Sequence, residues 1–296
     1  MKYTKPPLSF ETQADQLIKR GLETNRELLI SRLKAVSYYR LSGYWHPFRI
    51  PTDDNFKENT TFEQIWHRYV FDRQLRLCFM DAIERIEIAL RTDCIYYFSH
   101  EYGPFSYLKS ENFPNISVAQ HNRLLTTIYS ETLKSNEIFV KHFNVKYGDE
   151  HTMLPLWMIA EIIPFGSLLT FYKGIDKTIK RIISQKYDLS FKIMESWLMT
   201  LNTIRNICAH HGRLWNRELG IKPIIPDTKS PEWHTPVKID NHRMFCILTI
   251  LRYLLKYIAP QSEWHNRLEK LLNKYPDVPF KSMGFPDGWE ESEIWN

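Results

Sequence analysis

The sequence predicts an all-α fold, and three observations lead to that prediction. Apolar residues make up 43% of the 296 residues, which is typical of a folded globular protein and not of a disordered chain. Only 10 residues are glycine, below half of the usual share of about 7%. Apolar side chains recur at steps of three and four residues, and no segment indicates a β-meander or an internal repeat. We therefore expect a multi-helix bundle.

The first 60 residues are expected to form an N-terminal helical and aromatic extension. Residues 9–34 have the pattern of two short helices, with Gly21 as a natural stop between them. Residues 36–48 are rich in large rings: Tyr38, Tyr39, Tyr44, Trp45 and Phe48. The favoured interpretation of this cluster is an aromatic corner of the core, and direct stacking on a ligand is the alternative.

Residues 61–296 are expected to form the main helical domain. The longest helical pattern covers 61–98, where apolar residues recur at helical spacing: Phe71, Leu75, Phe79, Ile83, Ile86 and Leu90. Glycine and proline make 99–118 a loop and the best candidate for an internal break. Four prolines make 218–240 a long irregular loop.

Further helices are expected at about 118–146, from 154, from Ser167, through 197–215, and at 240–259 and 262–274. Glu161 falls within the apolar helix that begins near 154. A lone buried glutamate is usually paired with an arginine, so a structural role is favoured over catalysis.

Composition excludes several classes of site. The four cysteines stand apart without a paired set of zinc ligands, so we expect reduced thiols and no metal. The signatures of nucleotide-binding loops, zinc proteases and serine hydrolases are absent from the sequence, so no cofactor is expected. No signal-peptide core or membrane-spanning run occurs, which predicts a cytoplasmic protein without a membrane partner. The net charge of +5 is compatible with an anionic partner.

The most informative segment is 205–217. It contains three arginines, two asparagines and two histidines without an acidic residue. Guanidinium groups bind phosphate, and imidazole moves protons near neutral pH. An arginine with a histidine five to seven residues later is a weak signal, because chance gives about two such matches in a chain of this composition. Arg40 with His46 is such a match, and we interpret it as fortuitous.

A helix drawn through 197–215 divides the candidate catalytic and RNA-binding residues from the apolar ones. One polar face carries Arg205, Asn206, His210, Asn202 and Arg213. His211 falls inside the opposite apolar arc, so it is expected to be structural and His210 is the candidate for catalysis. Arg205 and His210 lie about 140° apart on a regular helix. Either the helix is distorted near Gly212, or a second copy completes the centre in a symmetric dimer.

A second basic segment, 173–192, accompanies this helix. A solvated basic face is the default interpretation, and a rim that binds phosphate is the sharper one. The side chains expected to bind RNA are Arg213, Arg217, Asn202, Lys173, Lys177, Lys180 and Arg181.

Five stretches together carry a family resemblance. They are 38–45 (YYRLSGYW), 71–76 (FDRQLR), 82–87 (AIERIE), 154–157 (LPLW) with Phe165-Gly166, and 205–211 (RNICAHH). In this order they resemble the Abi-like proteins (abortive infection, AbiD/AbiF type), through nearly the whole chain. The resemblance implies the HEPN superfamily of helical, typically dimeric ribonucleases, and hence a HEPN-like bundle and a homodimer.

The resemblance also implies a function. It is that of a metal-independent endoribonuclease toxin in an antiphage abortive-infection or toxin–antitoxin system, silenced by an RNA or protein antitoxin. Residue by residue, Arg205 and His210 match the HEPN pair, and Asn206 matches the polar residue that follows the arginine. The expected chemistry is attack by the ribose 2′-OH on the adjacent phosphorus. DNA is not an expected partner, because it lacks that hydroxyl.

Two other interpretations stay open at this point. In the first, the protein is a non-catalytic RNA-binding or scaffold component of a defence ribonucleoprotein, because the same side chains also suit phosphate contact. In the second, Arg205 and His210 are only structural, tied to Glu161 or to backbone carbonyls.

Overall fold

The computed structural model describes residues 2, 4, 6–227 and 230–296. Within these residues the protein is all-α as predicted: 64% is helical, in 12 α-helices, and no strand forms. Two isolated bridges, Glu23–Thr61 and Arg49–Phe56, are the only β-type pairings in the described ranges. None of the helices formed by these residues is both long and apolar enough to cross a bilayer.

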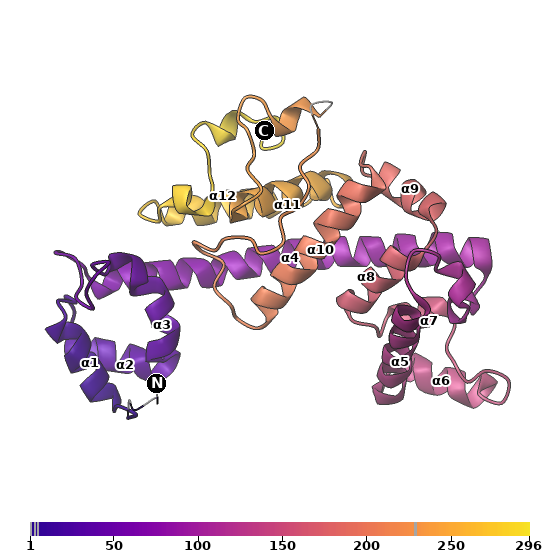
Figure 1. Ribbon diagram of the computed structural model, residues 1–296, viewed down its shortest axis with the longest axis horizontal. Helices are drawn as coiled ribbons and strands as arrows, with labels where there is room; N and C mark the ends of the chain where they lie inside the picture. Colours follow the sequence, from indigo (N-terminus) through magenta and orange to yellow (C-terminus); the bar gives the residue numbers. More distant parts are fainter. Residues whose placement is uncertain (1, 3, 5, 228–229) are drawn as a thin grey trace.

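Helix α4 (Phe62–Tyr102) is the axis around which the other helices gather (Figure 1). It has 41 residues and begins with a capping box, in which Thr61 and Gln64 satisfy each other's backbone N–H groups. It ends at Gly103, whose φ of 90° is a backbone conformation that glycine adopts readily and other residues rarely adopt. The predicted apolar positions from Phe71 to Leu90 are all 0–1% exposed. The helix is therefore held by burial along its length.

Helices α1 (Phe10–Lys19), α2 (Arg26–Val36) and α3 (Tyr38–Trp45) lie at the N-terminal end of α4 (Figure 1). The aromatic corner predicted here is confirmed, because Tyr44 and Trp45 are 2% and 1% exposed. Helix α3 packs directly on α4. A separate extension of residues 1–60 stays a prediction.

Four helices lie at the other end of α4: α5 (Val118–Lys134), α6 (Ile138–Tyr147), α7 (Leu156–Ala160) and α8 (Phe165–Gly174) (Figure 1). The prediction of one helix over about 118–146 was wrong. The chain forms α5 and α6 instead, because Ser135 between them is extended and its hydroxyl accepts from the N–H of Glu137. The loop predicted over 99–118 begins only at Gly103, because α4 continues to Tyr102, and it contains two short 3₁₀ turns, Ser106–Leu108 and Ser110–Asn112. Its Tyr107 and Phe113 are 1% exposed and belong to the core.

Helices α9 (Lys177–Gln185), α10 (Phe191–Ala209), α11 (Met244–Ile258) and α12 (Trp264–Lys274) complete the bundle. The last three pack against α4. Between α10 and α11 the chain is irregular as predicted, with one short 3₁₀ turn, Pro231–Trp233, in its described part. Trp197 of α10 anchors this loop by donating to the carbonyl of Ile224 at 2.7 Å.

Candidate functional site

Helix α10 ends at Ala209, six residues earlier than a helix through 215 requires. The N–H of His211 donates to Cys208 at 3.0 Å, and the N–H of Gly212 donates to Ile207 at 2.7 Å. These two bonds form a Schellman motif, with His211 in the left-handed conformation at φ 57°. The prediction of a continuous helix was wrong, and the distortion expected near Gly212 is a complete stop.

Gly212 makes this stop possible. A Cβ atom at this position would lie 2.9 Å from Cγ2 and 3.1 Å from the carbonyl oxygen of Ile207. A side chain at this position would crowd Ile207, so glycine favours the tight turn over the end of α10. Residues after 209 therefore do not follow the 100° step of a helix, and a helical wheel misplaces them.

The placement of His211 in an apolar arc was wrong for this reason. The turn exposes His211, and it exposes His210 at the C-cap as well. Neither imidazole makes a hydrogen bond in the part of the chain that the structure describes. Two exposed imidazoles without a hydrogen-bonding partner among the described residues thus follow each other at the end of α10.

Arg205 and Asn206 lie one turn earlier on the same helix. Arg205 is half-buried and Asn206 is exposed. The Arg205 guanidinium has no hydrogen bond or ion pair to any described residue. The alternative interpretation, in which Arg205 is bound to Glu161 or to backbone carbonyls, is therefore not supported by any hydrogen bond or ion pair of the described residues. Asn202, further back, lies 4.0 Å from where a Cβ of Gly166 would be, at the contact between α8 and α10.

A groove of about 620 Å³ lies beside this turn. Its walls come from the end of α2, from α3, from α4 and from the end of α10. The charged or ionisable side chains that line it are Arg40, Tyr69, Arg73, Arg76, His211 and Cys208. No carboxylate lines the groove. Arg73, which is exposed, lines the groove with Arg40 and His211, and this makes the groove suited to an anion such as a phosphodiester.

Arg40 and Arg76 hold the turn in place. Arg40 donates to the carbonyl of His211 at 2.7 Å, and Arg76 donates to that of Gly212 at 3.4 Å. Cations at the C-terminus of a helix are favoured by its dipole. The Arg40–His46 match was interpreted as fortuitous, but Arg40 itself belongs to the groove. The signal that could have found it is the stretch 38–45, which carries part of the family resemblance.

Asp72 joins the three segments that form the site. Its carboxylate, 0% exposed, accepts from the hydroxyl of Tyr44 at 2.6 Å and from the N–H groups of Leu214 and Trp215 at 3.0 and 2.6 Å. It also forms an ion pair with Arg76. Burial raises the pKa of Asp72, and the hydrogen bonds together with the charge of Arg76 oppose that rise. Burial and the Asp72 charge raise the pKa of Tyr44, which keeps its phenol a donor.

Several residues expected to bind RNA have structural partners. Arg213 donates to the carbonyl of Gly43, and Arg217 donates to the carbonyl of Arg213 at 2.6 Å. Lys180 is 3% exposed and donates to Glu195 at 2.9 Å, so its placement on an open surface was wrong. Helix α9 turns this lysine towards α10 together with its apolar side chains.

The other residues of the basic segment 173–192 that were expected to bind RNA differ in their exposure to solvent. Lys177 and Arg181 are exposed, and Lys173 is half-buried. Their contact with a nucleic acid stays a prediction.

Glu161 is exposed, and the expectation of a buried glutamate was wrong. Helix α7 ends at Ala160 and α8 begins after Pro164, so Glu161 lies at a helix end and not within a helix. Arg91, the neighbouring cation, instead donates to Glu87 and to the carbonyls of Ala160 and Ile163.

The Cys208 thiol borders the groove but is protonated near neutral pH. Burial raises the pKa of Cys208 to about 12, so this thiol stays protonated although it borders the groove. In the residues placed by the structure, no group of three histidine, cysteine, aspartate or glutamate side chains could hold a metal ion.

The strained turn makes a testable prediction. His211→Gly should raise the free energy of unfolding by about 0.5–1 kcal/mol, because relief of the left-handed strain exceeds the entropy that glycine loses on folding. Ala209→Gly, two residues earlier in α10, should lower it by about 1 kcal/mol. Urea unfolding of both variants measures the difference, and an equal loss in both would contradict the assigned turn.

Comparison with known proteins places the chain in a family. No curated protein and no solved structure matches the sequence. A family model described as Abi-like protein matches residues 31–216, which is more than half of the chain. The matched region includes α3, α4 and the end of α10, and thus the groove and the network around Asp72. The chain belongs to the Abi-like protein family.

Proposed function

We propose that this protein is an endoribonuclease of abortive-infection defence that cleaves RNA at the end of α10. The observation that carries the proposal is the set of unpaired side chains there. Arg205, His210 and His211 make no side-chain hydrogen bond or ion pair with other described residues, and a groove lined by three arginines and no carboxylate adjoins His211. Groups that are kept free of partners are available to a ligand. Membership of the Abi-like family supports the role in defence.

The proposed chemistry uses the ribose 2′-OH as the nucleophile. His210 takes the proton of that hydroxyl while the 2′ oxygen attacks the adjacent phosphorus, and the P–O5′ bond breaks. The products are a 2′,3′-cyclic phosphate and a 5′-hydroxyl, whose oxygen needs a proton. His211, the second exposed imidazole, is the residue that we assign to donate it. No metal is required, because the nucleophile belongs to the substrate.

Arg205 and Asn206 have supporting roles in this scheme. The Arg205 guanidinium stabilises the charge that develops on the phosphoryl oxygens, and Asn206 orients the phosphate or the histidine. Arg73, exposed and without a partner among the described residues, binds the phosphate of a neighbouring nucleotide in the groove. HEPN-type assembly would bring the ends of two α10 helices together in a homodimer. An antitoxin, RNA or protein, would then act by covering this face.

Expression in a bacterial host tests the proposal. The wild type should arrest growth and degrade cellular RNA, whereas Arg205→Ala and His210→Ala should do neither at equal protein levels. Arg123→Ala and His142→Ala, exposed on α5 and α6, are matched controls that should remain toxic.

Two outcomes would contradict the proposal. Intact RNA that co-purifies with the wild type would favour the non-catalytic RNA-binding protein. RNA breakdown by all four variants alike would place the activity elsewhere.

A further inference from the structure

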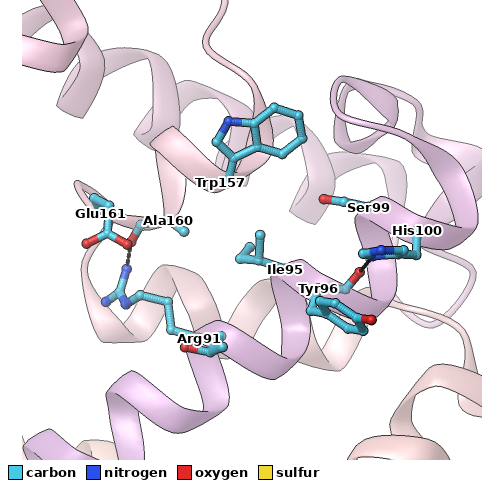
Figure 2. A pocket seen from close by; sticks show the side chains of 9 residues that line it. Arg91, Ile95, Tyr96, Ser99, His100, Trp157, Ala160 and Glu161 are labelled. Carbon is cyan, nitrogen blue, oxygen red and sulfur yellow. Dashed lines mark hydrogen bonds between the residues drawn. The ribbon is translucent and has the colours of Figure 1, made fainter.

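A second pocket lies between the C-terminal half of α4 and α7, away from the groove beside His211. Its volume is about 450 Å³, and its lining is mostly apolar (Figure 2). Pockets of this size that combine aromatic walls with a few polar groups are typical of ligand sites. None of the residues assigned to catalysis lines it.

The walls of the pocket are exposed aromatic side chains. Trp157 of α7 is 49% exposed, whereas six of the other tryptophans are 0–3% exposed. Tyr96 of α4 is 54% exposed, and its ring lies 4.1 Å from that of His100. Figure 2 shows Trp157 on one side of the space, with Ile95 and Tyr96 on the other. A flat ring can lie between these two sides.

The polar groups of the pocket lie at its two ends (Figure 2). At one end, the Arg91 guanidinium is occupied by Glu87 and two carbonyls, while the Glu161 carboxylate has no hydrogen bond or ion pair to any described residue. At the other end, the Ser99 hydroxyl is buried without a partner in the described structure. A buried hydroxyl without a partner is unfavourable unless a ligand satisfies it.

These features define the chemistry of the ligand. It has two apolar faces for the aromatic walls, an edge with N–H donors for the Glu161 carboxylate, and an acceptor for the Ser99 hydroxyl. Guanine combines all three, because its N1–H and 2-amino group point the same way and N7 and O6 accept. Unpaired RNA bases are bound in this manner, by stacking on aromatic rings and by hydrogen bonds to their edges.

The pocket and the groove share one face of α4. Arg73 and Leu77 line the groove, and Arg91 and Ile95, each 18 residues later, line the pocket. Eighteen residues are five helical turns, so the two sites face the same way at a separation of about 27 Å. One single strand can therefore reach both.

We propose that this pocket binds an unpaired guanine base of the RNA, several nucleotides from the bond that is cleaved. Trp157 and Tyr96 stack on the base, Glu161 accepts from its Watson–Crick edge, and Ser99 donates to it. The inference rests on the proposed ribonuclease function for the identity of its ligand. Binding of this base would let the pocket select which RNA the protein cleaves.

The test measures binding separately from cleavage. Fluorescent 12-mers of 2′-O-methyl uridine with one central guanosine, inosine or adenosine resist attack by a 2′-OH and are titrated by anisotropy. The wild type should bind the guanosine probe about 10-fold more tightly than the other two, because inosine lacks the 2-amino group and adenosine lacks N1–H.

Three variants and one control assign this preference to the pocket. Trp157→Ala should weaken binding of the guanosine probe about 5- to 150-fold, and Trp157→Phe should restore most of it. Glu161→Gln should abolish the preference for guanosine over inosine. Tyr129→Ala removes a ring that is 51% exposed on α5 and should change nothing.

The proposal is overturned by equal binding of the three probes, or by a Trp157→Ala variant that binds guanosine as the wild type does. Guanosine monophosphate that binds as tightly as the probe would assign the pocket to a free nucleotide and would overturn the RNA ligand. Failure of the ribonuclease proposal looks different: RNA stays uncut while the preference for guanosine persists.

Discussion

Asp72→Ala should lower the free energy of unfolding by about 3–5 kcal/mol, the cost of removing one partner of a buried ion pair. The substitution leaves the Arg76 guanidinium, 8% exposed, without its counter-ion. It also leaves the Tyr44 hydroxyl and the N–H groups of Leu214 and Trp215 without their acceptor. Because this carboxylate ties α3 and the chain after α10 to α4, we expect the groove to lose its shape as well.

Asp81→Ala is the matched control for this prediction. Asp81 is on the same helix and forms the same i, i+4 pair, with Arg85, but its side chain is 36% exposed and it also pairs with Arg267. Exposed pairs contribute about 0–1 kcal/mol. Urea unfolding followed by circular dichroism compares the two variants. If they lost equal stability, the Asp72 network would not be what holds the turn to α4.

The second large effect concerns the rate of RNA cleavage. With purified protein in single-turnover conditions, His210→Ala should reduce the rate about 10²- to 10⁴-fold, the usual contribution of a general base. Arg205→Ala should reduce it about 10²- to 10³-fold, as the loss of a group that stabilises transition-state charge does. The cleaved RNA should carry a 2′,3′-cyclic phosphate, and a DNA strand of the same sequence should stay intact.

His211→Gly separates the two imidazoles in this assay. The variant keeps the turn, because glycine adopts the left-handed conformation of residue 211. A fall in the cleavage rate together with unchanged or higher stability would assign His211 to the chemistry and not to the fold. A rate equal to that of the wild type would leave His210 as the one imidazole that acts. Full activity of His210→Ala would remove the scheme altogether.

Much of the fold could be predicted because its signals are local. The apolar spacing from Phe71 to Leu90 predicted α4, and Gly21 predicted the stop after α1. Glycine and proline predicted the loop after α4, although its start was placed at 99 and α4 continues to Tyr102. Prolines predicted the irregular chain before α11. These features depend on side chains within a few residues of each other, so periodicity and turn chemistry are enough to find them.

The site was predicted less completely because it depends on contacts between distant segments. Composition selected the stretch 205–217 as the candidate site, but a helical wheel could not show that α10 ends at Ala209. A lysine is usually exposed to solvent, but the tertiary structure buries Lys180, which donates to the carbonyl of Lys173 and to Glu195 of α10. Glu161 was expected to be buried because a continuous helix was assumed around it.

By itself, the sequence determined that the chain is helical, where most helices lie, and which short segment carries the arginine and the two histidines. Only the tertiary structure decided which of these side chains share a surface. Arg40 meets the carbonyl of His211 across 171 residues, and Asp72 accepts from Trp215 across 143. Such contacts are set by how helices pack around α4, and local spacing carries no information about partners so far away in the chain.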